Sequence, residues 1–393
     1  MEAPYSRIYA EINLDNVVKN VEAMAAGLPE GTRIIGVVKA DGYGHGSVPV
    51  ARAIDPYVGG YAVAALEEGG LLRGHGIKKP ILVLGNAPAR QLADFLRYDI
   101  RPSLFQLSKA KLLSELAVMQ RVRAGIHLAV DTGMSRIGFQ PTAQSIEEAA
   151  EIASLPGIET EGIFTHFARA DEADQGATDR QYAAFMEFAD ELERRGVRIP
   201  IRHASNSAAA LNRPGMGLDA VRAGISMYGI YPSDEIAWGL NLRPAMEIRS
   251  FITCIREIAA GTPVSYGGTF TADRAMRIAT ISAGYADGYP RSLSGKGYVL
   301  IGGKRAPVLG RICMDQFMAD VSGILQAQEE MPVTLVGSDG GETLSMEQLA
   351  QMAGGFRYEI PCVLGKRVPR VYIKDGRVAG TKDYQGDIYK DFL

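Results

Sequence analysis

Cysteine is scarce in this chain, and its few cysteines are not arranged in pairs. Cys254, Cys313 and Cys362 are the three cysteines among 393 residues, and no Cys-x-x-Cys motif is present. Three thiols cannot build a disulfide framework, which argues against a secreted scaffold and favours a reducing compartment. The N-terminus, MEAPYSRIYAEINLDNV, also lacks the basic start and apolar core of a signal peptide. We therefore expect a cytoplasmic location.

The sequence also lacks an excess of charge and any long apolar run. Lysine and arginine number 42 and aspartate and glutamate 45, so the net charge is −3. A nearly neutral chain has no global field that attracts nucleic acid or an anionic membrane. No uninterrupted apolar run approaches the ~20 residues that span a bilayer. We expect neither a nucleic-acid partner nor a membrane partner.

The residues that are present give an ordinary globular composition. Apolar residues make up 47% and charged residues 22%. These values exclude a disordered chain, a collagen and a simple coiled coil. At ~150 residues per domain, the length suggests two or three domains. Glycine is abundant, with 45 residues, and many glycines follow strand candidates, which predicts tight loops.

The first part of the chain alternates between short Val- and Ile-rich runs and amphipathic segments. Residues 178–195, for example, place Tyr182, Phe185, Phe188 and Leu192 on one helical stripe. Eight strand candidates, each followed by a helix candidate, predict an α/β fold with a (β/α)₈ TIM-type barrel over residues 1–239. These candidates are Arg33–Val38, Tyr61–Ala65, Pro80–Leu84, Ile100–Ser103, Ile126–Val130, Gly162–Thr165, Ile201–His203 and Ala220–Arg222.

Beyond Gly239 the pattern changes to strands joined by glycine-rich turns, which predicts a mostly β C-terminal domain over residues 240–393. Ser345–Met352 is the one clear helix candidate there, opened by a serine N-cap. An early strand at about residues 6–12, around Ile8–Ile12, fits either domain. The strand candidates of this region are Ala245–Ile255, Ala275–Ser282, Gly297–Ile301, Met318–Val321, Val333–Val336 and Arg370–Ile373.

The sharpest local motif is a lysine followed at once by a glycine-rich loop, VVKADGYGHG at residues 37–46. Lys39 stands at the C-terminal end of the first barrel strand, the face where barrel active sites gather. A lysine desolvated in such a place suits Schiff-base chemistry, although a single lysine often only reaches from a strand end into solvent. The adjoining glycines favour the functional interpretation, because they let backbone approach a ligand closely.

This motif resembles the pyridoxal-phosphate motif of the alanine racemase family, and the resemblance continues along the chain in the family's order. The further motifs are HLAVDTGMSRIGF at 127–139, GIFTHFARADE at 162–172, HASNSAA at 203–209, VRAGISMYG at 221–229, VSYGGTF at 264–270, YADGYPR at 285–291, GRICMDQ at 310–316 and YEIPCVLGKRVPR at 358–370. The family fold is a (β/α)₈ barrel followed by a β domain, which agrees with the pattern above.

The resemblance implies a pyridoxal 5′-phosphate cofactor held by Lys39, and no metal. Its phosphate would be bound by the hydroxyls of Ser207, Tyr43 and Tyr358 and by the backbone amides of Gly224 and Ile225. Arg222 would face the pyridine nitrogen. Because an arginine hardly gives up its proton, the ring becomes a weaker electron sink and transamination is discouraged.

The resemblance also implies a two-base mechanism, since inversion needs proton transfer on both faces of the α-carbon. Lys39 would serve one face, and Tyr266 the other, supplied by the partner subunit of a homodimer with shared active sites. His166 would link Tyr266 to Arg222. Two further residues would bind the substrate carboxylate, Arg136 through its guanidinium and Met314 through its backbone amide. Asp315, Tyr285 and Arg291 would lie near the entrance.

The chain departs from the family at Ala129, two residues before Asp131. Many members carry there a lysine whose carbamate fixes the arginine that corresponds to Arg136. An alanine cannot form a carbamate, so we expect an anion, a water or another side chain, such as Asp131, beside Arg136.

The implied function is alanine racemisation, which supplies D-alanine for peptidoglycan from a small amino-acid substrate. A racemase of serine, lysine or several amino acids is the first alternative. A non-catalytic pyridoxal-phosphate carrier is the second, but such proteins resemble the barrel alone. A decarboxylase with the same two-domain plan would use a different phosphate loop and a catalytic cysteine, and the motifs do not match it.

Overall fold

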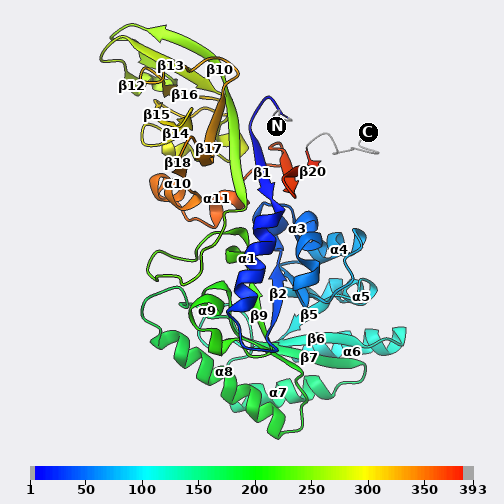
Figure 1. Cartoon of the computed structure of the whole chain (residues 1–393). Helices are drawn as coiled ribbons and strands as arrows, with labels where there is room; N and C mark the ends of the chain where they lie inside the picture. The colour runs from blue at the N-terminus through cyan, green and yellow to red at the C-terminus, as the bar shows by residue number, and fades with distance from the viewer. Residues whose placement is uncertain (1–4, 384–393) are drawn as a thin grey trace. The chain divides into compact units, whose positions relative to one another are not determined.

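The computed structural model describes residues 5–383 and falls into two compact units (Figure 1). The first unit runs from Asn16 to Arg243. The second combines the segment up to Asp15 with the segment from Pro244 onward. In the described part of the chain, no helix has both the length and the hydropathy that a membrane span requires.

The first unit is built on an eight-stranded parallel sheet in the order β8-β7-β6-β5-β4-β3-β2-β9. Backbone bonds from Asp219 to Arg202 (3.1 Å) and from Arg222 to Ser205 (2.9 Å) join the outermost strands, β9 and β8, so the sheet closes into a barrel. The prediction of a (β/α)₈ barrel is confirmed. The strands are β2 (Arg33–Val37), β3 (Gly60–Val63), β4 (Ile81–Asn86), β5 (Arg101–Leu104), β6 (Ala124–Ala129), β7 (Ile158–Phe164), β8 (Ile201–His203) and β9 (Ala220–Ala223).

Helices cover the outside of this barrel (Figure 1). The apolar stripe predicted for α8 packs inward, with Phe185, Phe188 and Leu192 fully buried. The helices are α1 (Leu14–Ala26), α2 (Lys39–Tyr43), α3 (Ser47–Ile54), α4 (Leu66–Gly74), α5 (Leu92–Arg97), α6 (Leu107–Gln120), α7 (Ala143–Ser154), α8 (Gly176–Arg194) and α9 (Ser207–Asn212), with short 3₁₀ turns η1 (Asp55–Tyr57), η2 (Ala89–Gln91), η3 (Pro214–Met216) and η4 (Ile225–Tyr228).

The second unit is mostly β, as the sequence predicts. Its main sheet has the order β18-β17-β14-β15-β16-β13-β10-β1-β19-β20. The strands are β1 (Tyr9–Asn13), β10 (Met246–Ile258), β13 (Met276–Ile281), β14 (Tyr298–Ile301), β15 (Lys304–Leu309), β16 (Phe317–Asp320), β17 (Pro332–Asp339), β18 (Glu342–Leu344), β19 (Arg370–Lys374) and β20 (Arg377–Lys382), and a separate hairpin pairs β11 (Pro263–Val264) with β12 (Phe270–Thr271).

The helix predicted at Ser345–Met352 is α10 (Met346–Ala353), and the Ser345 hydroxyl caps it by accepting a bond from the Gln348 amide. The rest of the unit's helical structure is short: α11 (Glu359–Cys362), η5 (Tyr266–Gly268), η6 (Tyr285–Asp287) and η7 (Arg291–Leu293). Tyr266, Tyr285 and Arg291 each open one of these 3₁₀ turns, and Tyr358 directly precedes α11, whereas Met314 lies in the loop between β15 and β16.

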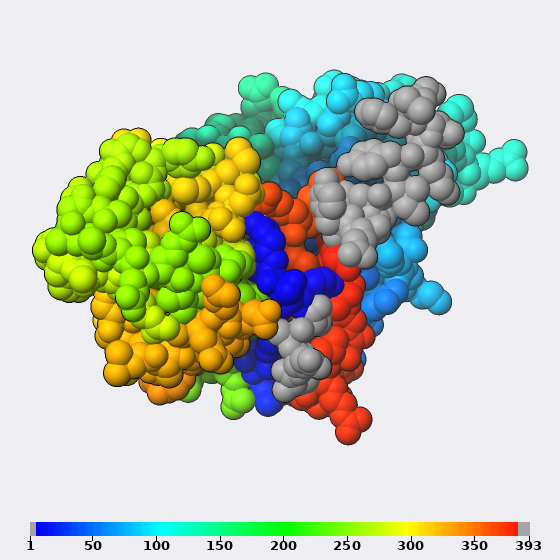
Figure 2. Space-filling view, turned by 90° about the horizontal axis from the view of Figure 1, so that it is seen from above, coloured from blue at the N-terminus to red at the C-terminus, as the bar shows by residue number. Residues whose placement is uncertain are grey.

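The early strand β1 belongs to the β unit. It pairs antiparallel with β10 and parallel with β19, so it lies between a strand that follows the barrel and one near the end of the chain. Figure 2 shows the N-terminal residues in blue against the red residues of this last part. Both ends of the described chain therefore complete one sheet.

Candidate active site

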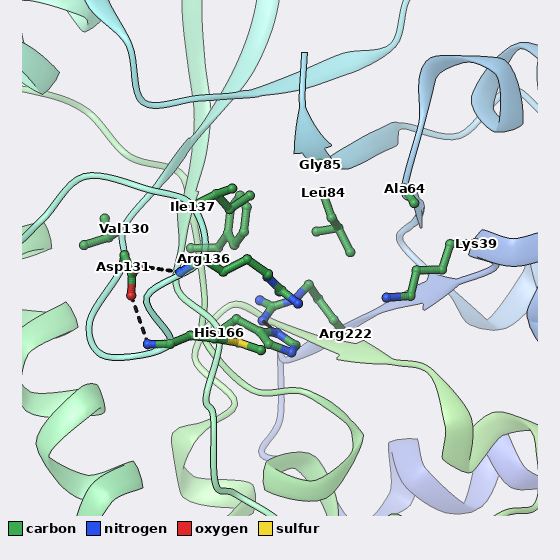
Figure 3. Close-up of a pocket in the computed structure, with 12 residues that line it drawn as sticks. Lys39, Ala64, Leu84, Gly85, Val130, Asp131, Arg136, Ile137, His166 and Arg222 are labelled. Atoms are coloured by element: carbon green, nitrogen blue, oxygen red, sulfur yellow. Dashed lines mark hydrogen bonds between the residues drawn. The ribbon is translucent and has the colours of Figure 1, made fainter. Parts of the chain in front are cut away.

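A cavity of about 260 Å³ opens at the C-terminal ends of the barrel strands (Figure 3). Lys39 follows β2, Arg136 lies in the loop after β6, His166 follows β7 and Arg222 lies on β9. These four side chains, predicted from the sequence as site residues, thus face one space. The lining residues are Lys39, Ala64, Leu84, Gly85, Val130, Asp131, Met134, Arg136, Ile137, Phe164, His166 and Arg222.

Lys39 opens a turn, α2, whose backbone is left-handed over several consecutive residues. Ala40, Asp41, Gly42 and Tyr43 all have φ between 51° and 63°. This conformation costs each residue other than glycine about 1–2 kcal/mol. A run of such residues persists only where surrounding contacts over-determine it, and such strain is typical of functional sites.

Two carboxylates hold this turn. Glu68 on α4 accepts the Ala40 amide at 2.7 Å and also the Ala64 amide at 2.7 Å, so it joins the ends of β2 and β3. Asp41 accepts the Ser47 amide at 3.0 Å, which ties the turn to the start of α3. These hydrogen bonds with α3 and α4 fix the backbone at Lys39, and therefore the direction in which its side chain leaves the turn.

Arg222 is the most constrained cation of the cavity, with 2% of its surface exposed. Its Nη1 donates to the Nδ1 and the carbonyl oxygen of His203, both at 2.9 Å. Its Nη2 donates to the carbonyls of Thr165 (2.7 Å) and Ala204 (2.9 Å) and to His166 Nδ1 (3.1 Å). All four Nη hydrogens are thus engaged, whereas the Nε–H meets no acceptor in the described part of the chain and can serve a ligand. Burial, with a further contribution from Arg136, lowers the pKa of Arg222 to about 9, so it stays charged at neutral pH.

His166 is held neutral beside Arg222. Burial, together with the charges of Arg222, Arg136 and Lys39, holds the pKa of His166 well below its usual value. Because its Nδ1 accepts from Arg222, its proton resides on Nε2. His166 therefore presents a donor on the side away from Arg222.

Arg136 is positioned by Asp131 through the backbone. The Asp131 carboxylate accepts the amides of Gly133, Met134 and Ser135 on one oxygen and that of Arg136 on the other, at 2.8–3.0 Å. The bonds from Met134 and Arg136 are the dashed lines in Figure 3. Burial alone would raise the pKa of Asp131, but these four bonds outweigh it and hold the pKa below its ordinary value. Among residues 5–383, no hydrogen bond or ion pair reaches the Arg136 guanidinium.

The residues predicted to bind a phosphate also converge in the barrel. The Ser207 hydroxyl accepts the Gly224 amide at 2.8 Å, next to the 3₁₀ turn that starts at Ile225. A Cβ on Gly224 would lie 2.8 Å from the Tyr43 hydroxyl, so this hydroxyl approaches the Gly224 backbone as closely as only glycine permits. Hydroxyl and amide groups from the ends of β2, β8 and β9 thus gather in one place.

The remaining predicted residues, Tyr266, Met314 and Tyr358, lie in the β unit. Tyr266 is 71% exposed in the single chain and follows Ser265, whose φ of +67° marks a strained backbone. Met314 is 51% exposed, and its carbonyl accepts the Ala286 amide at 3.0 Å, so it lies beside the turn that carries Tyr285. Tyr358 stacks on Phe356, with ring centroids 4.6 Å apart.

One group that sequence analysis missed is Asp287. Its fully buried carboxylate binds Arg7 through two bonds of 2.7 Å and the Arg367 Nε at 2.8 Å. Arg367 also binds the Asp315 carboxylate at 2.7 Å. This ion-pair cluster fixes the neighbouring turns of Tyr285 and Met314. The sequence gives no local signal for it, because its arginines stand near opposite ends of the chain.

Known proteins resemble this chain over nearly its whole length. Residues 12–232 match the family model "Alanine racemase, N-terminal domain", and residues 245–372 match "Alanine racemase, C-terminal domain". An alanine racemase of Desulforamulus reducens is 44% identical over 93% of this chain and 99% of its own length. One of Clostridium tetani is 43% identical over 96% of this chain and 98% of its own length.

Solved structures agree. An alanine racemase of Clostridium difficile 630 superposes with a TM-score of 0.93 at 39% identity, covering 97% of this chain and all of that one. One of Bacillus anthracis with bound L-Ala-P superposes with a TM-score of 0.92 at 36% identity, covering 98% of this chain and all of that one. The relatives and the family models, with the fold that they share, define an amino-acid racemase of the barrel-plus-β-domain type. Within that class, the chain belongs to the alanine racemase family.

Proposed function

We propose that this enzyme binds pyridoxal 5′-phosphate in the barrel cavity and interconverts L-alanine and D-alanine, acting as a homodimer with shared active sites. The observation that carries the proposal is the convergence of Lys39, Arg222 and Arg136 on one cavity whose single carboxylate, Asp131, is saturated by backbone amides. Such a cavity suits a ligand with a phosphate and a carboxylate.

The residues of the cavity fit this cofactor. Lys39 supplies the amine for covalent attachment. The Arg222 Nε–H donates to no acceptor within residues 5–383, so it suits a ring nitrogen. Ser207, Tyr43 and Ile225 offer hydroxyl and amide groups for the phosphate, joined in this proposal by Tyr358 of the β unit. The Gly224 amide donates to the Ser207 hydroxyl and would be shared between that hydroxyl and the phosphate. When bound, the cofactor withdraws electrons from the substrate's α-carbon and makes its proton acidic.

Side chains of the protein would then remove the α-proton of the substrate and return it. The Lys39 amine and the Tyr266 hydroxyl exchange it on opposite faces of the α-carbon, and Tyr266 comes from the partner subunit. His166, neutral and with its proton on Nε2, would donate a hydrogen bond to the tyrosine oxygen. Arg136 and the Met314 amide orient the substrate carboxylate. The product D-alanine would serve peptidoglycan synthesis. Cys254, Cys313 and Cys362 form no disulfide within residues 5–383, which supports a cytoplasmic site of action.

A trapping experiment tests the cofactor site. Borohydride reduction of the purified enzyme should fix the cofactor to the peptide that contains Lys39, as read by mass spectrometry, and Lys39→Ala should abolish the adduct. Lys109→Ala, which removes a lysine of α6 outside the cavity, is the matched control and should leave it intact. An adduct on any other lysine would overturn the assignment.

Racemisation assays test the substrate. L-Alanine should be converted at the highest kcat/KM, ahead of L-serine, L-lysine and L-arginine. A higher kcat/KM for L-serine, L-lysine or L-arginine would show that the enzyme is a racemase of another amino acid. If cofactor-loaded enzyme racemised none of the four amino acids, the non-catalytic carrier would be favoured.

A further inference from the structure

Two buried histidines continue inward from Arg222 through the barrel. His203, at the end of β8, accepts from Arg222 Nη1 on its Nδ1 at 2.9 Å. Its Nε2 lies 2.8 Å from the Nδ1 of His127, in the middle of β6. Both rings are buried, with exposed fractions of 0% and 5%. The described mechanism uses neither of them.

The hydrogen bonds leave a single arrangement of protons along this row. An arginine only donates, so the Nδ1 of His203 must be unprotonated. Burial, with the charge of Arg222, holds the pKa of His203 well below its usual value, so its ring is neutral and carries its proton on Nε2. That proton is donated to the Nδ1 of His127, which must accept. The proton of His127 then resides on its own Nε2.

His127 is itself placed closely and kept neutral. A Cβ on Gly162 of β7 would lie 2.6 Å from its ring, so only glycine lets the imidazole pack against that strand. Burial, with the charges of Arg101 and Arg222, lowers the pKa of His127 to about 3. Arg101 is paired with Glu161 at 2.9 Å, and both line, with His127 and Arg33, a small cavity away from the active-site residues.

We propose that His127 is a positioning residue for Arg222: by accepting the Nε2 proton of His203, it fixes the tautomer whose Nδ1 receives Arg222 Nη1, and it thereby aims the Arg222 Nε–H into the cavity. With the other tautomer, His203 would turn an N–H toward the Arg222 N–H, and the guanidinium would have to rotate. The part of the proposal that concerns Arg222 and the cofactor rests on the proposed function, whereas the tautomers can be measured in the cofactor-free protein.

The first test is ¹⁵N NMR of histidine-labelled protein, which distinguishes the two tautomers and has five histidines to assign. In the unaltered enzyme, His203 and His127 should both carry their proton on Nε2. A His203 protonated on Nδ1 would overturn the proposal without any variant.

The second test compares His127→Asn with His127→Leu. Asparagine places Oδ1 as many bonds from Cα as the Nδ1 of histidine, so it keeps an acceptor, whereas leucine removes it. In His127→Leu we expect His203 to leave the pure Nε2–H tautomer, the visible absorption band of the bound cofactor to shift, and its dissociation constant to rise about tenfold, as for the loss of one well-placed hydrogen bond. His127→Asn should stay near the unaltered enzyme in all three.

His75→Leu, at an exposed histidine after α4, is the matched control and should change none of these readouts. Equal damage in the asparagine and leucine variants would show a packing role and overturn the proposal, as would a leucine variant with unchanged His203 tautomer and cofactor band. If the leucine variant does not fold, the tautomers of the unaltered enzyme and of His127→Asn decide. An unaltered enzyme that binds no cofactor would instead refute the proposed function while leaving the tautomer result to stand or fall separately.

Discussion

Arg136 brings a guanidinium to the cavity with no carboxylate beside it in the described structure. Ala129, where many family members carry a carbamate-forming lysine, is 1% exposed and offers no charge. The sequence left Asp131 open as a substitute partner, yet both Asp131 oxygens already accept backbone amides. With Lys39 and Arg222 nearby, this corner has excess positive charge, which favours a small anion such as chloride or a bound water.

We therefore predict that activity does not depend on bicarbonate. Ala129→Lys should create a lysine that can form a carbamate, so bicarbonate should change kcat/KM of this variant severalfold and leave the unaltered enzyme unchanged. Ala129→Met, a long side chain that cannot be carbamylated, is the matched control and should not respond. A rise in the rate of the unaltered enzyme with bicarbonate would contradict the prediction.

At the scale of elements, the left-handed turn after β2 depends on groups outside itself. Positive φ is sterically unfavourable for Ala40, Asp41 and Tyr43. The hydrogen bonds that the Glu68 and Asp41 carboxylates accept from backbone amides offset this strain. Because Glu68 also binds the Ala64 amide, it couples the Lys39 turn to the end of β3.

Glu68→Ala should therefore loosen the Lys39 turn. We expect cofactor affinity to fall about tenfold or more, since two charge-assisted hydrogen bonds are lost, and amide exchange at Ala40 to accelerate. Absorbance titration with the cofactor measures its affinity, and hydrogen exchange measures the opening of the Ala40 amide. Glu67→Ala, an exposed neighbour on the same helix, is the control. Unchanged cofactor affinity in the Glu68 variant would show that the left-handed turn is stable without the hydrogen bonds to Glu68.

The elements show how far sequence reasoning reaches. The eight barrel strands were predictable because buried parallel strands are short runs of Val and Ile between turn signals. In the β unit, β15 was missed because Pro307 and the charged residues Lys304 and Arg305 break the apolar pattern. β20 was missed because an exposed edge strand needs no alternation of apolar and polar residues. The left-handedness of the Lys39 turn could not be predicted, since contacts from Glu68 and Ser47 decide it.

The candidate site divides in the same way. Lys39 at a strand end is a local signal, and the family resemblance identified Arg136, His166 and Arg222. Asp287 could not be predicted from the sequence, because its partners, Arg7 and Arg367, are brought together only by the strands of the β unit. A role for His127 could not be predicted either, because it depends on a hydrogen bond with His203 across the barrel interior.

At the scale of the whole molecule, the proposed sharing of active sites can be tested by mixing. Neither Lys39→Ala nor Tyr266→Phe homodimers should racemise alanine at more than a small fraction of the normal rate. After subunit exchange, each heterodimer contains one intact site, so random mixing should restore about a quarter of the normal activity. Mass spectrometry should verify that exchange has occurred. If verified heterodimers stay inactive, the sites are not shared.

Acid should destabilise the folded enzyme. The pKa values of His127, His166 and His203 are lowered, so below about pH 6.5 the unfolded state binds more protons than the native state. Stability is thus fully present above that pH and falls as pH drops toward the folded pKa values, by up to about 1.4 kcal/mol per pH unit for each histidine. Asp131, with its lowered pKa, adds a further loss at lower pH in the same direction.

Urea unfolding of the cofactor-free protein between pH 7.5 and about 5 measures this slope. His127→Asn removes one of the three histidines and should give a shallower dependence on pH, while His75→Asn, at an exposed position, should not. An unfolding midpoint that is independent of pH over this window would contradict the assignment of neutral, buried histidines.

The pairing of β1 with β10 and β19 has a consequence for how the chain is made. On the ribosome, Tyr9–Asn13 emerges well before either of its partner strands, because the antiparallel one begins at Met246 and the parallel one at Arg370. The barrel, which is continuous in sequence, can fold while the rest is still being translated. The sheet of the β unit is complete only after β19 and β20 have been made, so the loop bearing Tyr266 is synthesised before its sheet is complete. A chain that stopped before Met246 would leave β1 without either of its partner strands.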